Sequence, residues 1–158
     1  MKRITWVLLI LLPVIFTACE EDDKTWDPNN YKEVQLDYEN MFYHFKEGIS
    51  TRGNMPDDID GMGIINEPWC TDLPALCGNY VVTEYSSFSD LTTPPAGEYE
   101  STCDQTPLNT VLVFKLSDGT YGLVMLTSDQ YNIVENEYCE HVVTLRINYP
   151  AFTDSVSE

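Results

Sequence analysis

Apolar and polar residues alternate in several short stretches of the chain, and this period of two is typical of half-buried β-strands. The alternation is clear at 34–39 and again at 143–149, and the stretch 79–85 is also strand-like. Residues 38–49 are ambiguous, because their apolar positions fit either a strand or one face of a helix. The pattern predicts a mainly β fold, a single β-rich domain built as an antiparallel sheet or a sandwich with long loops.

The clearest pair of predicted strands lies on either side of Asp118-Gly119, where VLVFKLS precedes the dipeptide and TYGLVMLT follows it. Asp-Gly between apolar runs is typical of a two-residue type I′ hairpin turn. In that register Phe114 faces Leu123. Because both faces of the hairpin are apolar away from the turn, we expect it to lie in the middle of a sheet.

Two long stretches lack this alternation. Residues 53–78 are rich in Gly and Pro, and residues 86–109 are rich in Ser, Thr and Pro. Both are predicted to be long loops. Loops of this length are uncommon in a small domain and tend to be either functional or disordered.

The N-terminus predicts export. Two basic residues precede an apolar run at 4–16 that is too short to cross a bilayer as a helix, so residues 1–18 are interpreted as a signal peptide. The motif Phe16-Thr17-Ala18-Cys19 resembles the lipobox of bacterial lipoproteins, whose cysteine is acylated and becomes the mature N-terminus. The lipid bilayer would then hold the protein through the acyl chains of Cys19. The alternative is a plain cleaved signal with a spare thiol at Cys19.

Four carboxylates follow Cys19 directly, at residues 20–23. Such a tract resembles the signal that sends lipoproteins of Bacteroidetes-type bacteria to the outer face of the outer membrane. A solvated spacer is the other interpretation. We expect an acidic tether at 19–32, a β-rich globular domain at 33–158, and a lipid-anchored protein of the outer membrane that is exposed at the cell surface.

Charge excludes one class of partner. The chain carries a formal net charge of −18, and removal of Lys2 and Arg3 with the signal gives 6 − 26 = −20 for the mature chain of 158 − 18 = 140 residues. Nucleic acid needs clustered Lys and Arg, and the sequence has no such cluster. The length fits a single domain with a core of its own.

Four cysteines remain after Cys19, and an even number in an exported chain predicts two disulfides. Of the three connectivities, the preferred one joins Cys70 to Cys77 and Cys103 to Cys139. A zinc site is the competing interpretation, but the spacing C-x6-C is wider than that of structural zinc sites.

No catalytic constellation emerges, and we expect that the protein is not an enzyme. The two histidines, His44 and His141, lie in predicted strands and are interpreted as packed or surface side chains. The segment Asp57 to Gly61 (DDIDG) is weakly similar to a calcium loop, although it lacks the spacing and distal glutamate of an EF-hand. A plain acidic turn is the alternative, and no metal site is predicted.

The segment VLVFKLSDGTYGLVMLTSDQY, followed by HVVTLRINYPAF, resembles the C-terminal part of the HmuY-like haem-binding lipoproteins of Bacteroidetes, and DYENMFYHFKEGISTRG is similar to an upstream segment of that family. The resemblance implies a β-rich fold that holds haem between two axial side chains on loops within 53–109 and passes it to an outer-membrane transporter. That window contains no histidine, so the role would fall to Met55 and Met62, with Trp69 nearby.

Two other functions stay open. The sequence contains ten tyrosines and three tryptophans, whose planar side chains suit sugar stacking and protein interfaces. The protein could therefore be a non-catalytic accessory lipoprotein that binds glycan or protein. It could also be a disulfide-stapled spacer without a ligand.

Overall fold

A computed structural model describes residues 26–52, 60–65, 74–134 and 138–153. Within these ranges the regular structure is one 3-10 turn and nine strands, and all the strand pairs are antiparallel. The mainly β fold is therefore confirmed. In the described ranges, no helix is long and apolar enough to cross a membrane. The elements are β1 (Lys32–Leu36), β2 (Phe42–His44), β3 (Ile49–Thr51), β4 (Gly61–Ile65), β5 (Ala75–Val82), η1 (Phe88–Asp90), β6 (Glu100–Gln105), β7 (Val111–Lys115), β8 (Thr120–Val134) and β9 (Tyr138–Thr153).

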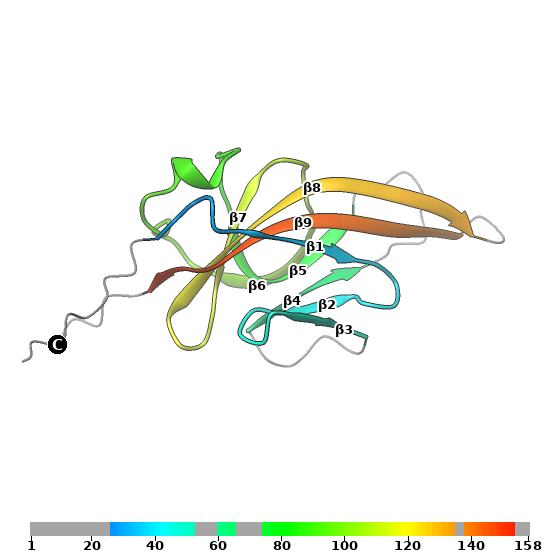
Figure 1. The fold of residues 1–158 in the computed structure, drawn as a ribbon, viewed down its shortest axis with the longest axis horizontal. Coiled ribbons are helices and arrows are strands. Elements are labelled where there is room, and N and C mark those ends of the chain that lie inside the picture. The colour runs from blue at the N-terminus through cyan, green and yellow to red at the C-terminus, as the bar shows by residue number, and fades with distance from the viewer. Residues whose placement is uncertain (1–25, 53–59, 66–73, 135–137, 154–158) are drawn as a thin grey trace, which may run out of the picture.

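The strands form one sheet in the order β1-β9-β8-β7-β5-β4-β2-β3, and β6 pairs with β5 outside this path. The sheet curls until its two ends, β1 at one side and the β2–β3 hairpin at the other, approach each other (Figure 1). The result is a nearly closed, barrel-like sheet. We call the unpaired junction between β1 and the β2–β3 hairpin the seam.

The interior of the curled sheet holds the main core, to which all the long strands contribute. Its fully buried side chains include Leu36, Phe45, Met62, Leu76, Phe114, Leu126 and Leu145. A second, smaller core lies on the opposite face of β7 and β8, where Val113 and Leu123 pack against Phe88 and Leu91 of the η1 segment. Alternate residues of β7 and β8 therefore enter different cores, which confirms that both faces of this hairpin are buried.

The turn of the β7–β8 hairpin differs from the prediction. Lys115 pairs with Tyr121, and the backbone N–H of Leu116 donates a 2.9 Å hydrogen bond to the carbonyl of Thr120, so the loop contains three residues, 117–119, rather than two. Of the two residues expected at positive φ, only Gly119 has it, at 80°. A type I turn followed by one left-handed residue is the usual three-residue hairpin loop. The predicted type I′ turn and the pairing of Phe114 with Leu123 are wrong by one residue.

Two strands lie where long loops were expected, and an ambiguous stretch is resolved. β4 (GMGII) is an apolar run without alternation, because four of its five residues are buried between neighbouring strands. β6 (ESTCDQ) is an exposed edge strand whose residues are almost all polar, so its sequence shows no alternation of apolar and polar residues. Residues 42–51 form the β2–β3 hairpin and not a helix.

The disulfide that the structure describes joins Cys77 of β5 to Cys103 of β6, which face each other directly in the ladder. Both preferred pairings, Cys70 with Cys77 and Cys103 with Cys139, are therefore wrong. Sequence spacing could not show that β6 pairs with β5. Cys70 and the side chain of Cys139 lie outside the described part of the structure.

The packed part of the chain begins ahead of β1. The ring of Trp26 lies 4.9 Å from that of Phe152 on the smaller core. The backbone carbonyl of Asp27 accepts a hydrogen bond of 2.8 Å from the side-chain amide of Asn148. Residues 26 and 27, which were assigned to the tether, thus contact the sheet.

Candidate ligand-binding site

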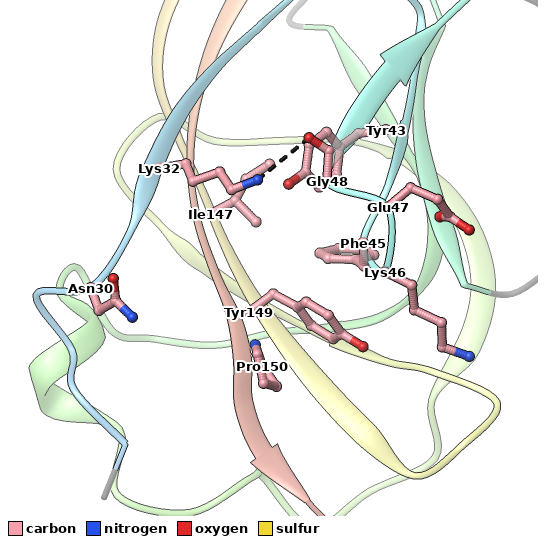
Figure 2. Close-up of a pocket in the computed structure, with 10 residues that line it drawn as sticks. All are labelled: Asn30, Lys32, Tyr43, Phe45, Lys46, Glu47, Gly48, Ile147, Tyr149 and Pro150. Carbon is pink, nitrogen blue, oxygen red and sulfur yellow. Dashed lines mark hydrogen bonds between the residues drawn. The ribbon is translucent and has the colours of Figure 1, made fainter. Parts of the chain in front are cut away.

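A pocket of about 360 Å³ lies at the seam, between the two ends of the sheet (Figure 2). We call it the seam pocket. One wall comes from the start of β1 and from β9, and consists of Asn30, Lys32, Ile147, Tyr149 and Pro150. The other wall comes from β2 and the turn that follows it, and consists of Tyr43, Phe45, Lys46, Glu47 and Gly48. Its volume lies at the lower end of the range for small-molecule sites.

The floor of the pocket is aromatic. Tyr43 and Phe45 are each 2% exposed, and Tyr149 is half-buried and reaches from β9 toward Phe45 (Figure 2). The ring of Phe45 lies 5.6 Å from those of both Tyr43 and Tyr149, and 5.3 Å from that of Phe114 deeper in the core. The floor is therefore an extension of the main core to the surface.

This floor depends on a glycine in β8. A Cβ atom placed on Gly122 would lie only 2.6 Å from Cε1 of Phe45, so the absence of a side chain at this position leaves room for the ring. Aromatic rings at these separations contribute roughly 0.5–1.5 kcal/mol per pair beyond their burial. The position of Phe45 is thus set by packing on several sides.

The rim of the pocket is polar. Lys32 is exposed and points across the seam, where its ammonium group donates a 3.4 Å hydrogen bond to the backbone carbonyl of Gly48 (Figure 2). Within the described ranges, Lys32 has no carboxylate partner. The side chains of Lys46 and Glu47 both extend away from Lys32 (Figure 2).

Lys46, in the wall formed by the turn after β2, is held by two aspartates. Its ammonium nitrogen lies 2.5 Å from Oδ2 of Asp60 and 3.2 Å from Oδ2 of Asp118, and these hydrogen bonds raise the pKa of Lys46 above its usual range. Asp60 also accepts hydrogen bonds of 2.6 and 2.7 Å from the backbone N–H and hydroxyl of Ser117. The cluster ties the turn after β2 to the start of β4 and to the β7–β8 turn.

The two aspartates of this cluster stay ionised for different reasons. Burial of Asp60 acts to raise its pKa, but the hydrogen bonds from Lys46 and Ser117 outweigh this effect and leave the pKa lowered. For Asp118, the hydroxyl and then the backbone N–H of Thr120 are the main causes that lower the pKa to about 2. Both groups are therefore anions at neutral pH.

Of the predicted ligand-binding residues, the structure describes Met62, and Met62 does not line this pocket. Met62 is 0% exposed in β4, among the side chains of the main core. Its thioether would reach a bound haem only if the core opened. Met55 and Trp69 lie outside the described residues, so their expected role stays a prediction.

The residues that line the pocket were not singled out from the sequence as a site. Tyr149 belongs to a predicted strand, and the aromatic residues near position 43 were noted only for their periodicity. The one local signal is the repeated placement of aromatic residues in Phe42-Tyr43-His44-Phe45. Their meeting with β9 follows from the curvature of the sheet, which no local pattern encodes.

The remaining polar candidates have partners of their own. Nε2 of His44 lies 3.1 Å from the hydroxyl oxygen of Thr51, and Nδ1 of the buried His141 lies 2.9 Å from a carboxylate oxygen of Asp129. Asp60, the described aspartate of the predicted acidic turn, is occupied by Lys46 and Ser117. Among the described residues, no group of three or more His, Cys, Asp or Glu could hold a metal ion.

The fold and the pocket define a small β protein with a curled antiparallel sheet and a surface pocket at its seam. No family model matches the chain, and no curated protein matches it either. The chain is similar to the crystal structure of a candidate lipoprotein from Bacteroides fragilis NCTC 9343. The two are 14% identical, the match covers 77% of this chain and 90% of the other, and the TM-score is 0.45.

Proposed function

We propose that the protein is a cell-surface lipoprotein that binds a small, flat-faced molecule such as a sugar in the seam pocket, without catalysis. The observation that carries this proposal is the pocket itself, which combines an aromatic floor with a polar rim. Small-molecule sites are usually concave and largely apolar, with a few polar groups that fix the orientation of the ligand. A sugar ring has one apolar face for an aromatic ring and hydroxyl groups at its edge for polar partners.

The geometry of the two walls supports a binding role. Ile147 belongs to β9 near the middle of its ladder with β8, and Tyr43 belongs to β2, which pairs on both sides with β3 and β4. Side chains on paired strands hold their positions better than side chains on loops. A ligand would therefore meet a largely preformed site, which lowers the entropy cost of binding.

Haem capture is the less favoured function for this pocket. The resemblance implies methionine as the axial ligand of haem, and among the described residues no methionine or histidine lines the seam pocket. The proposal that haem is bound would depend on Met55, which lies outside the described residues.

Attachment of Cys19 to lipid completes the proposal. Seven residue steps separate Cys19 from Trp26, the first described residue, and a fully extended chain spans about 3.5 Å per residue. The packed domain would therefore lie within about 25 Å of the bilayer surface. The acidic residues at 20–23 support export to the outer face of the outer membrane, where an outer-membrane transporter or a glycan would be accessible.

Amide chemical-shift mapping by NMR tests the proposed function. The purified mature protein is titrated with a panel of mono- and disaccharides and, separately, with hemin. We expect saturable shifts at Gly48 and Ile147 with at least one sugar, and loss of these shifts in Tyr149→Ala. Tyr85→Ala removes an exposed tyrosine that does not line the pocket, and it serves as the matched control. Shifts confined to other parts of the sheet, or none with any sugar, would reject the proposal.

A further inference from the structure

From the charges around the seam pocket, we infer that its ligand is an acidic sugar, with a carboxylate that binds the ammonium group of Lys32. This inference rests on the proposed function, because it assigns the chemical class of the ligand in the same pocket. It adds one specific contact, between the ligand carboxylate and Lys32. It also predicts that an acidic sugar binds more tightly than the matching neutral sugar, which a neutral sugar site would not show.

The cations of the described sheet differ in what they contact. Lys46 is paired with Asp60 and Asp118, and Arg146 is paired with Glu33 at 3.1 Å. Within the described ranges, Lys32 contacts only a neutral backbone carbonyl, that of Gly48. Lys32 is thus the cation at the pocket that keeps its charge available to a ligand.

The contact that Lys32 makes now is weak. Its 3.4 Å length exceeds the usual 2.7–3.2 Å of an N–H···O hydrogen bond. An ammonium group has three donors, so a ligand carboxylate could bind while the contact with Gly48 remains. Hydrogen bonds to charged groups are shorter and stronger than those between neutral groups.

Two other polar groups of the pocket, on Asn30 and Tyr149, suit the remainder of a sugar. The side-chain amide of Asn30 lies at the rim and can both donate and accept. The hydroxyl oxygen of Tyr149 lies 3.3 Å from that of Thr120, which orients it beside the aromatic floor. A hydroxylated ring with a carboxylate can use the lysine, the amide and the ring face at the same time.

The net charge of the protein makes this preference specific. With a formal charge of −18, the chain as a whole repels anions. A general affinity for anions is therefore not expected anywhere on the surface. Tighter binding of an acidic sugar than of its neutral counterpart must come from a local cation.

Isothermal titration of the purified mature protein with D-glucuronate and D-glucose tests the inference. The two sugars share one ring and differ by the carboxylate. We expect D-glucuronate to bind about tenfold more tightly, which is the lower end of what a hydrogen bond to a charged group contributes. The same comparison with D-galacturonate and D-galactose shows whether the preference follows the carboxylate.

Two substitutions of Lys32 and one control substitution locate the effect. Lys32→Met keeps most of the length of the side chain but removes its charge, and should lower the affinity for D-glucuronate about tenfold more than the affinity for D-glucose. Lys32→Arg should retain the preference. Arg52→Met removes a charge just after the end of β3, where the guanidinium lies over the ring of Tyr38, and should change neither affinity.

The outcomes separate this inference from the proposed function. Equal affinities for D-glucuronate and D-glucose, or a preference that survives Lys32→Met, overturn the acidic-sugar inference, while binding of D-glucose that depends on Tyr149 keeps the proposed function. The inference is also overturned if none of the four sugars binds. The proposed function is then judged by its own sugar panel. An unchanged free energy of unfolding of Lys32→Met in urea would show that the substitution leaves the fold intact.

Discussion

Gly122→Ala should destabilise the protein, because the new methyl group would occupy space that the ring of Phe45 fills. A Cβ atom at position 122 would lie 2.6 Å from Cε1, 2.9 Å from Cδ1 and 3.3 Å from Cζ of Phe45. The ring cannot move away freely, since it packs against Tyr43, Phe114 and Tyr149. Overpacking of a well-filled core costs about 1–3 kcal/mol, a large part of a total stability of about 5–15 kcal/mol.

The assay is equilibrium unfolding in urea with the disulfide oxidised. The free energies of unfolding are compared with one shared slope for their dependence on urea concentration. A second substitution, Phe45→Leu, tests the cause. With the ring absent, Gly122→Ala should cost about 1 kcal/mol less, since residues in contact show coupling of this size in double-mutant cycles. Gly97→Ala is the matched control. A Cβ atom there would meet nothing within 4 Å, so its stability should stay within about 0.5 kcal/mol of the parent protein.

Two results would refute this reasoning. The first is a Gly122→Ala protein as stable as the Gly97→Ala control, which would mean that the ring of Phe45 relocates at no cost. The second is a strictly additive double mutant, which would place the destabilisation elsewhere in β8. Either result would also weaken the claim that packing fixes the floor of the seam pocket.

Three further predictions concern the disulfide, the acid stability and the lipid anchor. Replacement of Cys77 and Cys103 by Ala should cost about 3.5 kcal/mol by chain entropy for a separation of 26 residues; peptide mapping that finds either cysteine in another disulfide would contradict the pairing. Because Thr120 lowers the pKa of Asp118 to about 2, the stabilisation by this carboxylate is complete above about pH 4 and is lost as the pH falls toward 2. Urea unfolding should therefore show a steeper loss of stability between pH 4 and pH 2 for the parent protein than for Asp118→Asn. An equal loss of stability with pH in the two proteins would contradict the role of Asp118. Cys19→Ala should abolish palmitate labelling and move the protein from the membrane to the soluble fraction, whereas unchanged partitioning would exclude acylation at this residue.

Much of the fold could be predicted from the sequence, because the alternation of apolar residues reports directly on which strands have a buried face. The pairing of β7 with β8, and burial on both of their faces, followed from the apolar residues on both faces of the hairpin away from Asp118-Gly119. The register did not follow. Whether one or two residues of that turn adopt positive φ is decided by the fit of the whole hairpin into the sheet, and a difference of one residue changes every cross-strand pair.

The candidate site could not be predicted, because its parts meet only after the sheet curls. Lys32 and Tyr149 belong to the first and last strands, and Phe45 belongs to the turn that closes the opposite end of the sheet. The same limit applies to the disulfide. Cys77 and Cys103 face each other because β6 lies beside β5, and the polar sequence of β6 gives no sign of a strand.

The sequence by itself determined the β class and the apolar hairpin at the centre of the sheet, since each depends on a local pattern of residues. The route of export stays a prediction. The tertiary structure alone decided the register of the central hairpin, the partner of Cys77 and the existence of the seam pocket. These features depend on the curvature of the sheet and on contacts between distant strands. Such contacts are set by the packing of the whole core rather than by neighbours in the chain.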